Sequence, residues 1–451
     1  MTARPERGVP LRGLVSGSIR ATVEHRGNRS AVVVRSLATE HRGALTPEDG
    51  ETIKVAAGQA CELRIPLVLV LATSGADVSE GVVSLHGWGL AARAITACSG
   101  LVPIVALVDG PALSGPALLL GLADVVIMTP AAYAFVSGPA MVEEFTGIRI
   151  GREQLGGVAV HARASGLCTF EVASLGEGLD LLDQLLAWLP GNTDELAPGS
   201  GPDGDDNDRP ELNQVIPGRA TSSYDVRRVA EVLADDGDLL EFGPRWSPQL
   251  VTGLARIDGR TVGVVANQPQ ALAGTLDIGA SQKGARFVRF CDAFNLPIVT
   301  LVDTPGFLPG KDLEWRGMIR HGAELAFAYA EATVPRICVI LRKAFGGAYI
   351  VMDSKGLGND LCFAWPSAEI AVMGAQGAAQ ILYRQATAEV RIEREAEYAE
   401  RFLTPWQAAE RGFVDAVITP GETRSVVIRS LRALATTREH LPARKHTIGP
   451  L

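Results

Sequence analysis

Two short turns are the parts of this sequence whose residue types and spacing could do chemistry. One is Gly346-Gly347-Ala348 and the other is Ser114-Gly115, and each follows an apolar run and precedes a further apolar one. At a turn between a strand and a helix, unpaired backbone N–H groups and the helix dipole both favour negative charge. Such donors stabilise an oxyanion that develops in a transition state. A single turn of this type is also explained by tight packing that needs glycine, so a second turn in register is needed to favour chemistry.

The two turns occupy matching places in an internal repeat. Landmarks of the first half recur between 231 residues later (65 to 296) and 236 residues later (135 to 371). These landmarks are the runs at 65–71, 102–108, 114–117 and 135–138, which match 296–302, 334–340, 346–349 and 371–374. In both halves, short Val/Ile-rich runs alternate with Ala-rich runs, which is typical of helices packed on sheets through βαβ crossovers. We therefore expect an α/β fold that is duplicated in tandem.

Length and composition suggest where the two copies begin and end. The chain has 451 residues, which is enough for roughly two or three domains with full cores. Pro, Gly and Asp are dense between 189 and 220, and a stretch of this composition cannot bury much apolar area. We expect a flexible tail at 1–20, a first domain at 21–190, an exposed linker at 191–219 and a second domain at 220–451.

Charge and motif content argue against several classes of protein. The net charge of −9 disfavours nucleic acid as the main partner. The six cysteines form no CxxC pair, so reduced thiols in the cytoplasm are expected rather than a disulfide framework. No apolar run is long enough for a signal peptide or a membrane helix. The sequence has no H-x-x-x-H or H-E-x-x-H pattern, so no metal is predicted, and His161 and His321 are interpreted as structural.

The second half resembles the β subunits of propionyl-CoA and acetyl-CoA carboxylases. The matching segments include D-I-G-A-S-Q-K-G-A-R-F-V-R-F-C-D at 277–292, V-D-T-P-G-F-L-P-G at 302–310, R-K-A-F-G-G-A-Y-I-V-M at 342–352 and A-W-P-S-A-E-I-A-V-M-G-A at 364–375. The first half is similar more loosely, through S-G-A-D-V-S-E-G-V at 74–82, G-P-A-L-S-G at 110–115 and Q-L-G-G at 154–157. The resemblance implies a crotonase-like fold in each half and an active site between two chains.

The resemblance also implies an activity, the transfer of a carboxyl group from carboxybiotin to the α-carbon of a short acyl-CoA such as acetyl-CoA or propionyl-CoA. Gly347 and Ala348 would donate backbone N–H groups to the ureido oxygen of biotin, and Ser114 and Gly115 to the thioester oxygen. An enolate would form and be held by these donors. Further residues expected at the biotin site are Gly346, Gly306 and Phe307, and those expected at the acyl-CoA site are Ser74, Gly75, Ala76, Gly138 and Ile350.

Partners follow from the same resemblance. The chain has no A-M-K-M-like biotinylation site and no G-x-x-x-x-G-K loop for ATP. Biotin would therefore be carried by a separate protein, and the partner would be a biotin carboxylase or biotin carrier (α) subunit. The resemblance further implies a homo-oligomer, a hexamer built as a trimer of dimers.

The first half departs from the family pattern at three positions. Ser114 replaces a glycine, Pro116 follows the turn and cannot donate an N–H, and Asp77 stands where the family has a positive residue. These changes leave alternatives open. They are a specialised carboxyltransferase or decarboxylase with an altered acyl acceptor, a non-catalytic homologue that pairs with an active subunit, or another crotonase-type enzyme such as a hydratase or isomerase.

Overall fold

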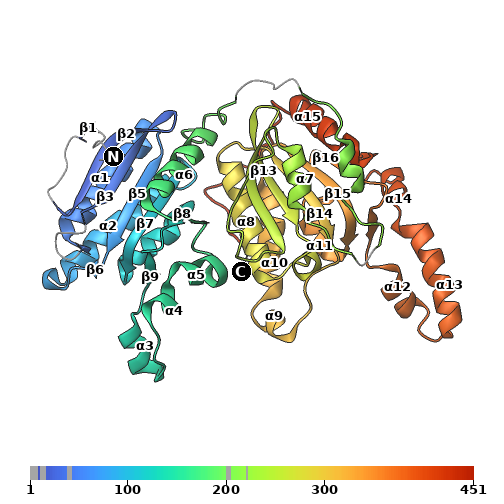
Figure 1. Ribbon diagram of the computed structural model, residues 1–451, viewed down its shortest axis with the longest axis horizontal. Coiled ribbons are helices and arrows are strands. Elements are labelled where there is room, and N and C mark those ends of the chain that lie inside the picture. Colours follow the sequence, from blue (N-terminus) through green and yellow to red (C-terminus); the bar gives the residue numbers. More distant parts are fainter. Residues whose placement is uncertain (1–8, 11–16, 38–42, 200–204, 220–221, 451) are drawn as a thin grey trace. The chain divides into compact units, whose positions relative to one another are not determined.

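The computed structural model describes residues 9–10, 17–37, 43–199, 205–219 and 222–450 (Figure 1). The chain divides into two compact units. The first comprises the described residues up to Pro198 together with Ala293–Asn295, and the second comprises those from Gly199 to Asp292 and from Leu296 onward. The predicted tail at 1–20 lies mostly outside the described residues, as do 200–204 of the predicted linker, so the domain boundaries stay predictions.

The sheet of the first unit has the order β1-β2-β3-β5-β7-β8-β10, with β9 paired to β7. Its strands are β1 (Val9–Pro10), β2 (Ile19–Arg26), β3 (Arg29–Ser36), β5 (Leu67–Thr73), β7 (Ile104–Leu113), β8 (Val125–Met128), β9 (Tyr133–Phe135) and β10 (Phe170–Glu171). The strands from β3 to β10 pair in parallel and are largely buried. Their Val, Ile and Leu residues match the near-continuous apolar runs that parallel strands require. A small second sheet joins β4 (Ala44–Leu45) to β6 (Gly75–Ala76).

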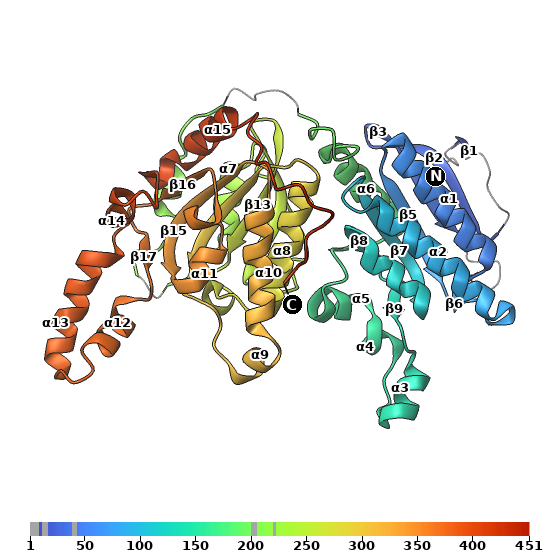
Figure 2. The same ribbon diagram turned by 180° about the vertical axis from the view of Figure 1, so that it is seen from behind.

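Helices cover both faces of this sheet. Figure 2 shows α1 (Pro47–Leu63) and α2 (Val82–Cys98) side by side along one face. Their close approach depends on glycine, since a Cβ on Gly50 would lie only 2.2 Å from the carbonyl oxygen of Gly87. The other helical segments described in this unit are η2 (Val78–Glu80), η3 (Gly115–Leu122), α3 (Pro139–Thr146), α4 (Arg152–Gly156), α5 (Val158–Val160), the π-helical turn His161–Ser165, and α6 (Leu175–Trp188), which packs on the opposite face (Figure 1).

The sheet of the second unit repeats the first. Its order is β11-β12-β13-β14-β15-β16-β18, with β17 paired to β15. The strands are β11 (Leu239–Glu241), β12 (Leu250–Ile257), β13 (Arg260–Asn267), β14 (Ile298–Thr304), β15 (Arg336–Phe345), β16 (Leu361–Ala364), β17 (Glu369–Ala371) and β18 (Ala416–Val417). Even an irregularity recurs, because the register shifts between Leu71 and Thr73 in one unit and between Val302 and Thr304 in the other. The predicted duplication of an α/β fold is thus confirmed down to strand register.

Helices again lie on both faces of the second sheet (Figure 1). One face carries α7 (Arg227–Leu233) and α15 (Thr423–Ala433), whose apolar residues form a continuous core with the strands. The other carries α8 (Ile278–Ala293) and α10 (Met318–Glu331). The remaining helices are α9 (Lys311–Trp315), α11 (Gly346–Val351), α12 (Ala375–Leu382), α13 (Ala388–Tyr398) and α14 (Pro405–Glu410). Within the described parts of the chain, no helix is both long enough and apolar enough to span a membrane.

Candidate functional site

The turn after β15 presents backbone donors at the start of α11. Gly346 has φ +60°, a conformation that glycine adopts without strain. Gly346, Gly347 and Ala348 are the first three residues of the helix, so their N–H groups have no acceptor within it. Ala348 is fully buried. The predicted biotin-side turn therefore offers N–H donors at the boundary between a strand and a helix.

The loop after β14 brings Phe307 against this turn. A Cβ on Gly347 would lie 3.5 Å from the Phe307 ring, and one on Gly322 would lie 3.3 Å from it. The loop is held by the backbone, because Leu276 N–H donates to the Gly306 carbonyl at 3.2 Å and Leu308 N–H donates to Leu276 at 2.8 Å. Phe307 and Gly347, both predicted at the biotin site, therefore lie close together.

A cavity of 440 Å³ opens beside the same turn. Its wall is mostly apolar, and it includes Phe307, Met318, Ile319, Gly347, Ile350 and Val351. The second unit therefore combines backbone donors with a largely apolar recess. Ile350 lies in this recess, on the same helix as the biotin-side turn, although it was predicted among residues of the acyl-CoA site.

A buried ion pair anchors the end of β14, and the sequence reasoning missed it. Asp303 Oδ2 accepts from Arg342 Nε at 3.0 Å, and Asp303 Oδ1 accepts from the Lys343 N–H at 3.1 Å. Burial raises the pKa of Asp303, an effect that the positive charge of Arg342 opposes. The available signal was an acidic residue that ends an apolar run immediately before T-P-G-F. The pair ties β14 to β15 just before the segments that carry Phe307 and Gly347.

The turn after β7 begins with a residue of similar φ but has different donors. β7 and β15 both have ten residues, so Ser114 corresponds to Gly346, Gly115 to Gly347 and Pro116 to Ala348. Ser114 has φ +61° and ψ −151°, close to a region that is almost exclusive to glycine. The predicted donor pairs of the two halves, Ser114 with Gly115 and Gly347 with Ala348, are therefore displaced by one residue from each other.

The Ser114 N–H group has an acceptor inside the protein. It donates to the Phe135 carbonyl of β9 at 2.9 Å. Pro116 has no N–H, and Gly115 begins η3, where an N–H has no acceptor within the helix. The ring of Trp88, on α2, packs closely against Gly115, because a Cβ at residue 115 would lie 3.1 Å from that ring. Of the predicted Ser114–Gly115 pair, the geometry thus favours Gly115 as the donor.

Apart from Ile350, the other residues predicted at the acyl-CoA site lie near this turn. Gly75 follows β5 with φ +117°, and a Cβ there would lie 3.2 Å from Ser114 Cβ. Its N–H donates to Thr73 Oγ1 at 3.1 Å, and Ser74 and Ala76 flank it. Gly138 precedes α3, in contact with the Phe135 ring. The Asp77 carboxylate caps the next turn, accepting from Ser79 N–H at 2.9 Å and from Ser79 Oγ–H at 2.6 Å.

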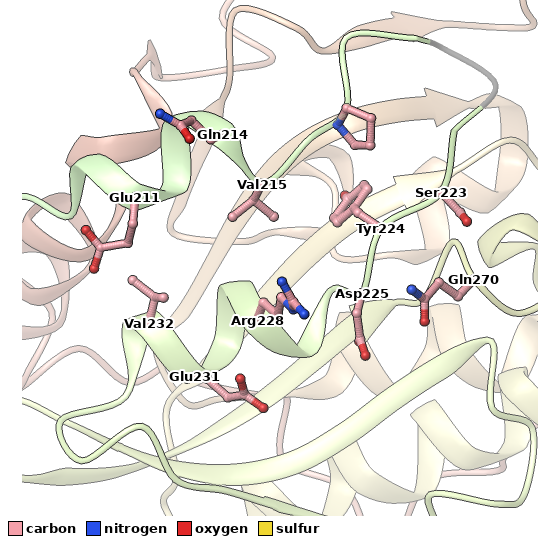
Figure 3. Close-up of a pocket in the computed structure, with 11 residues that line it drawn as sticks. Glu211, Gln214, Val215, Ser223, Tyr224, Asp225, Arg228, Glu231, Val232 and Gln270 are labelled. Carbon is pink, nitrogen blue, oxygen red and sulfur yellow. The ribbon is translucent and has the colours of Figure 1, made fainter.

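A second cavity lies elsewhere in the second unit and contains none of the predicted site residues. Figure 3 shows its lining, including Tyr224, Asp225, Arg228 and Glu231, and its volume is 750 Å³. It is more polar than the recess at Gly347. No cluster of three or more His, Cys, Asp or Glu side chains suited to a metal occurs among the residues that the structure describes.

Comparison with known proteins identifies the class of enzyme that this duplicated fold represents. The family model for the carboxyl transferase domain matches residues 6–448. A propionyl-CoA carboxylase beta chain from Saccharopolyspora erythraea is 44% identical over 429 residues, covering 91% of this chain and 79% of the relative. The methylmalonyl-CoA carboxyltransferase 12S subunit of Propionibacterium freudenreichii subsp. shermanii is 41% identical over 447 residues, covering 97% and 84%.

A solved structure agrees with these sequence relatives. Transcarboxylase 12S, determined as a hexamer with methylmalonyl-coenzyme A and methylmalonic acid bound, superposes with a TM-score of 0.95 at 40% identity, covering 96% of this chain and 85% of that one. The chain belongs to the carboxyl transferase family. The predicted family, the tandem crotonase-like fold and the carboxyltransferase class of enzyme are confirmed.

Proposed function

We propose that this protein moves a carboxyl group from carboxybiotin to the α-carbon of a short acyl-CoA of the acetyl-CoA and propionyl-CoA class. The observation that carries the proposal is the repetition of one strand-to-turn geometry, at Gly346 and at Ser114, within a carboxyl transferase fold. Each turn would stabilise negative charge that develops on an oxygen during the reaction. Neither site requires a nucleophilic side chain.

On the biotin side, we assign the donors to Gly347 and Ala348. Their N–H groups lie in the first turn of α11 and would hold the ureido oxygen. Gly346 supplies the positive φ that turns the chain. Phe307 and the apolar recess beside Gly347 would exclude water from the ring. The chemistry supplied with the bound biotin is the release of CO₂ and the uptake of a proton from the acyl α-carbon.

On the acyl-CoA side, Gly115 is the donor to the thioester oxygen, with Ser74, Gly75, Ala76 and Gly138 nearby. Proximity of the two bound substrates supplies much of the remaining rate enhancement. The engaged N–H of Ser114 and the proline at 116 support an alternative, a carboxyltransferase or decarboxylase with an altered acyl acceptor. A non-catalytic subunit that pairs with an active homologue is supported by the same observation.

The proposed partners are a separate biotin carboxylase or biotin carrier subunit and further copies of this chain. The related transcarboxylase 12S forms a hexamer. We propose the same assembly for this protein, a trimer of dimers acting in the cytoplasm, in which the acyl-CoA side of one chain faces the biotin side of another.

The test is a carboxyl-transfer assay with free biotin or a biotin carrier and a panel of acyl-CoA and carboxyacyl-CoA substrates. Ala348→Pro removes one N–H donor in the first turn of α11, and we expect transfer to fall by about 10²–10³. Ala348→Gly keeps the donor and serves as the matched control. A folded Ala348→Pro protein with the turnover of the parent contradicts the biotin-side assignment. Decarboxylation of carboxyacyl-CoA without transfer would favour the alternative.

A further inference from the structure

The strained turn at Ser114 is held in place by β9. This strand has three residues and pairs with β7, with Leu113 opposite Phe135. The Phe135 carbonyl accepts the Ser114 N–H at 2.9 Å. A non-glycine residue in this conformation costs about 1–3 kcal/mol and persists only when its surroundings restrain it. The position of β9 therefore decides whether the adjacent Gly115 N–H stays in place.

The outer edge of β9 is fastened by a histidine. Successive carbonyls of a strand point to opposite sides, so Ala134 O points away from the edge where Phe135 O meets Ser114. His161 Nε2 lies 2.8 Å from Ala134 O. A carbonyl oxygen can only accept, so Nε2 carries the hydrogen. His161 Nδ1 then accepts from the Ser165 hydroxyl at 2.7 Å, which fixes the orientation of the ring.

The Q-L-G-G segment explains why the histidine reaches this carbonyl. A Cβ on Gly156 would lie 2.0 Å from Ala134 O, so only glycine permits the backbone to pass so close. Gly157 forms an isolated antiparallel bridge with Tyr133. His161 follows one turn later, with its N–H donating to the Gly157 carbonyl at 3.2 Å. The spacing from Gly157 to His161 thus aims the imidazole at the edge of β9.

We propose that His161 is a positioning residue for the acyl-CoA side, acting through β9 on the Ser114–Gly115 turn. The inference rests on the proposed function of that turn. His161 donates to the Ala134 carbonyl, and the adjacent Phe135 carbonyl accepts from the Ser114 N–H. These two hydrogen bonds restrain the backbone that orients the Gly115 N–H. Loss of the Nε2 donor leaves the outer edge of the short strand held only by the Tyr133–Gly157 bridge, which allows the turn to relax.

The test compares His161→Leu, which removes the donor, with His161→Gln, whose amide nitrogen can replace Nε2. His25→Leu is the control, because His25 is exposed and lies on β2. The assembled parent and variants are compared by hydrogen exchange and by steady-state carboxyl transfer. In His161→Leu we expect the amides of 113–115 and 133–136 to exchange at least about tenfold faster, because opening of β9 exposes them. His161→Gln should restore slow exchange.

Kinetics separate positioning from general damage to the fold. A misplaced oxyanion donor acts in the transition state, so His161→Leu should lower kcat about tenfold or more and change KM for acyl-CoA by less than about threefold. His161→Gln should recover most of kcat. Unchanged amide exchange at 113–115 in His161→Leu overturns the inference, as does a rise in KM with kcat intact. A parent without carboxyl transfer refutes the proposed function instead, and the exchange measurement still tests whether His161 restrains the turn.

Discussion

Replacing Ser114 with glycine should stabilise the protein. Ser114 has φ +61° and ψ −151°, and its side chain is exposed. Relief of the backbone strain is worth about 1–3 kcal/mol. The greater freedom of glycine in the unfolded chain offsets about 0.4–1 kcal/mol of that gain. The expected net increase in the free energy of unfolding is about 1–2 kcal/mol, because the lost hydroxyl is at the surface.

The second unit supplies a reciprocal control. Gly346 has nearly the same φ, +60°, and a Cβ there would lie 3.1 Å from the Val372 carbonyl oxygen. Gly346→Ser should therefore lower the free energy of unfolding by about 1–3 kcal/mol, the cost of placing a side chain in this conformation. The two variants exchange the same pair of residues at equivalent turns, so we expect changes of opposite sign in the free energy of unfolding.

Urea unfolding and thermal unfolding measure both changes. For a unit of this size, 1 kcal/mol corresponds to about 2–4 °C in Tm, so Ser114→Gly should raise Tm of the transition that includes the first unit by several degrees. Carboxyl transfer should be retained, since the Gly115 N–H is unaffected. A Ser114→Gly protein that is less stable than the parent, while Gly346→Ser is destabilised as expected, would refute the strain assigned to Ser114.

Two further predictions concern buried groups. Cys61 Sγ and Cys98 Sγ lie 3.0 Å apart on α1 and α2, so hydrogen peroxide should link them, the two thiols losing two protons and two electrons as peroxide is reduced to water. The cross-link should add about 4 kcal/mol of stability, and its absence from peptide mass maps of oxidised protein would contradict this. Asp353 is paired with Arg336 at 2.6 Å, and burial raises its pKa from 3.8 to about 6. Because the folded state holds this proton more tightly, the stability from this group is present below about pH 4 and is lost as pH rises toward about 6. Asp353→Asn should remove this component from the pH dependence of unfolding; an unchanged pH profile would show that the group is ionised throughout.

Repetition is what made the fold predictable from sequence. Apolar runs of strand length recur at a nearly constant offset, and parallel strands buried on both faces need such runs. The glycine turns were located for the same reason, since the chain must leave each buried strand through a backbone conformation that favours glycine. The duplication also relates Ser114 to Gly346, a correspondence that depends only on the equal lengths of β7 and β15.

The donor assignment in the first half was less predictable because it depends on a distant residue. Whether the Ser114 N–H is free is decided by Phe135, which lies beyond another strand and joins β7 from the side. The Asp303–Arg342 pair was missed for a similar reason, because its partners come from different strands. Hydrophobic periodicity identifies strands but does not identify which buried polar groups meet between them.

The two halves differ in how many donors each turn can offer, and this difference bears on the reaction. The second turn has N–H groups at Gly347 and Ala348, whereas the first has Gly115 followed by a proline. Loss of one oxyanion donor costs about 3–4 kcal/mol of transition-state stabilisation. In the proposed roles, the first turn would therefore hold the thioester enolate less tightly than the second holds the ureido oxygen. An acyl acceptor whose α-proton is more acidic needs less stabilisation, so we expect the altered first turn to favour activated acyl-CoA substrates over acetyl-CoA.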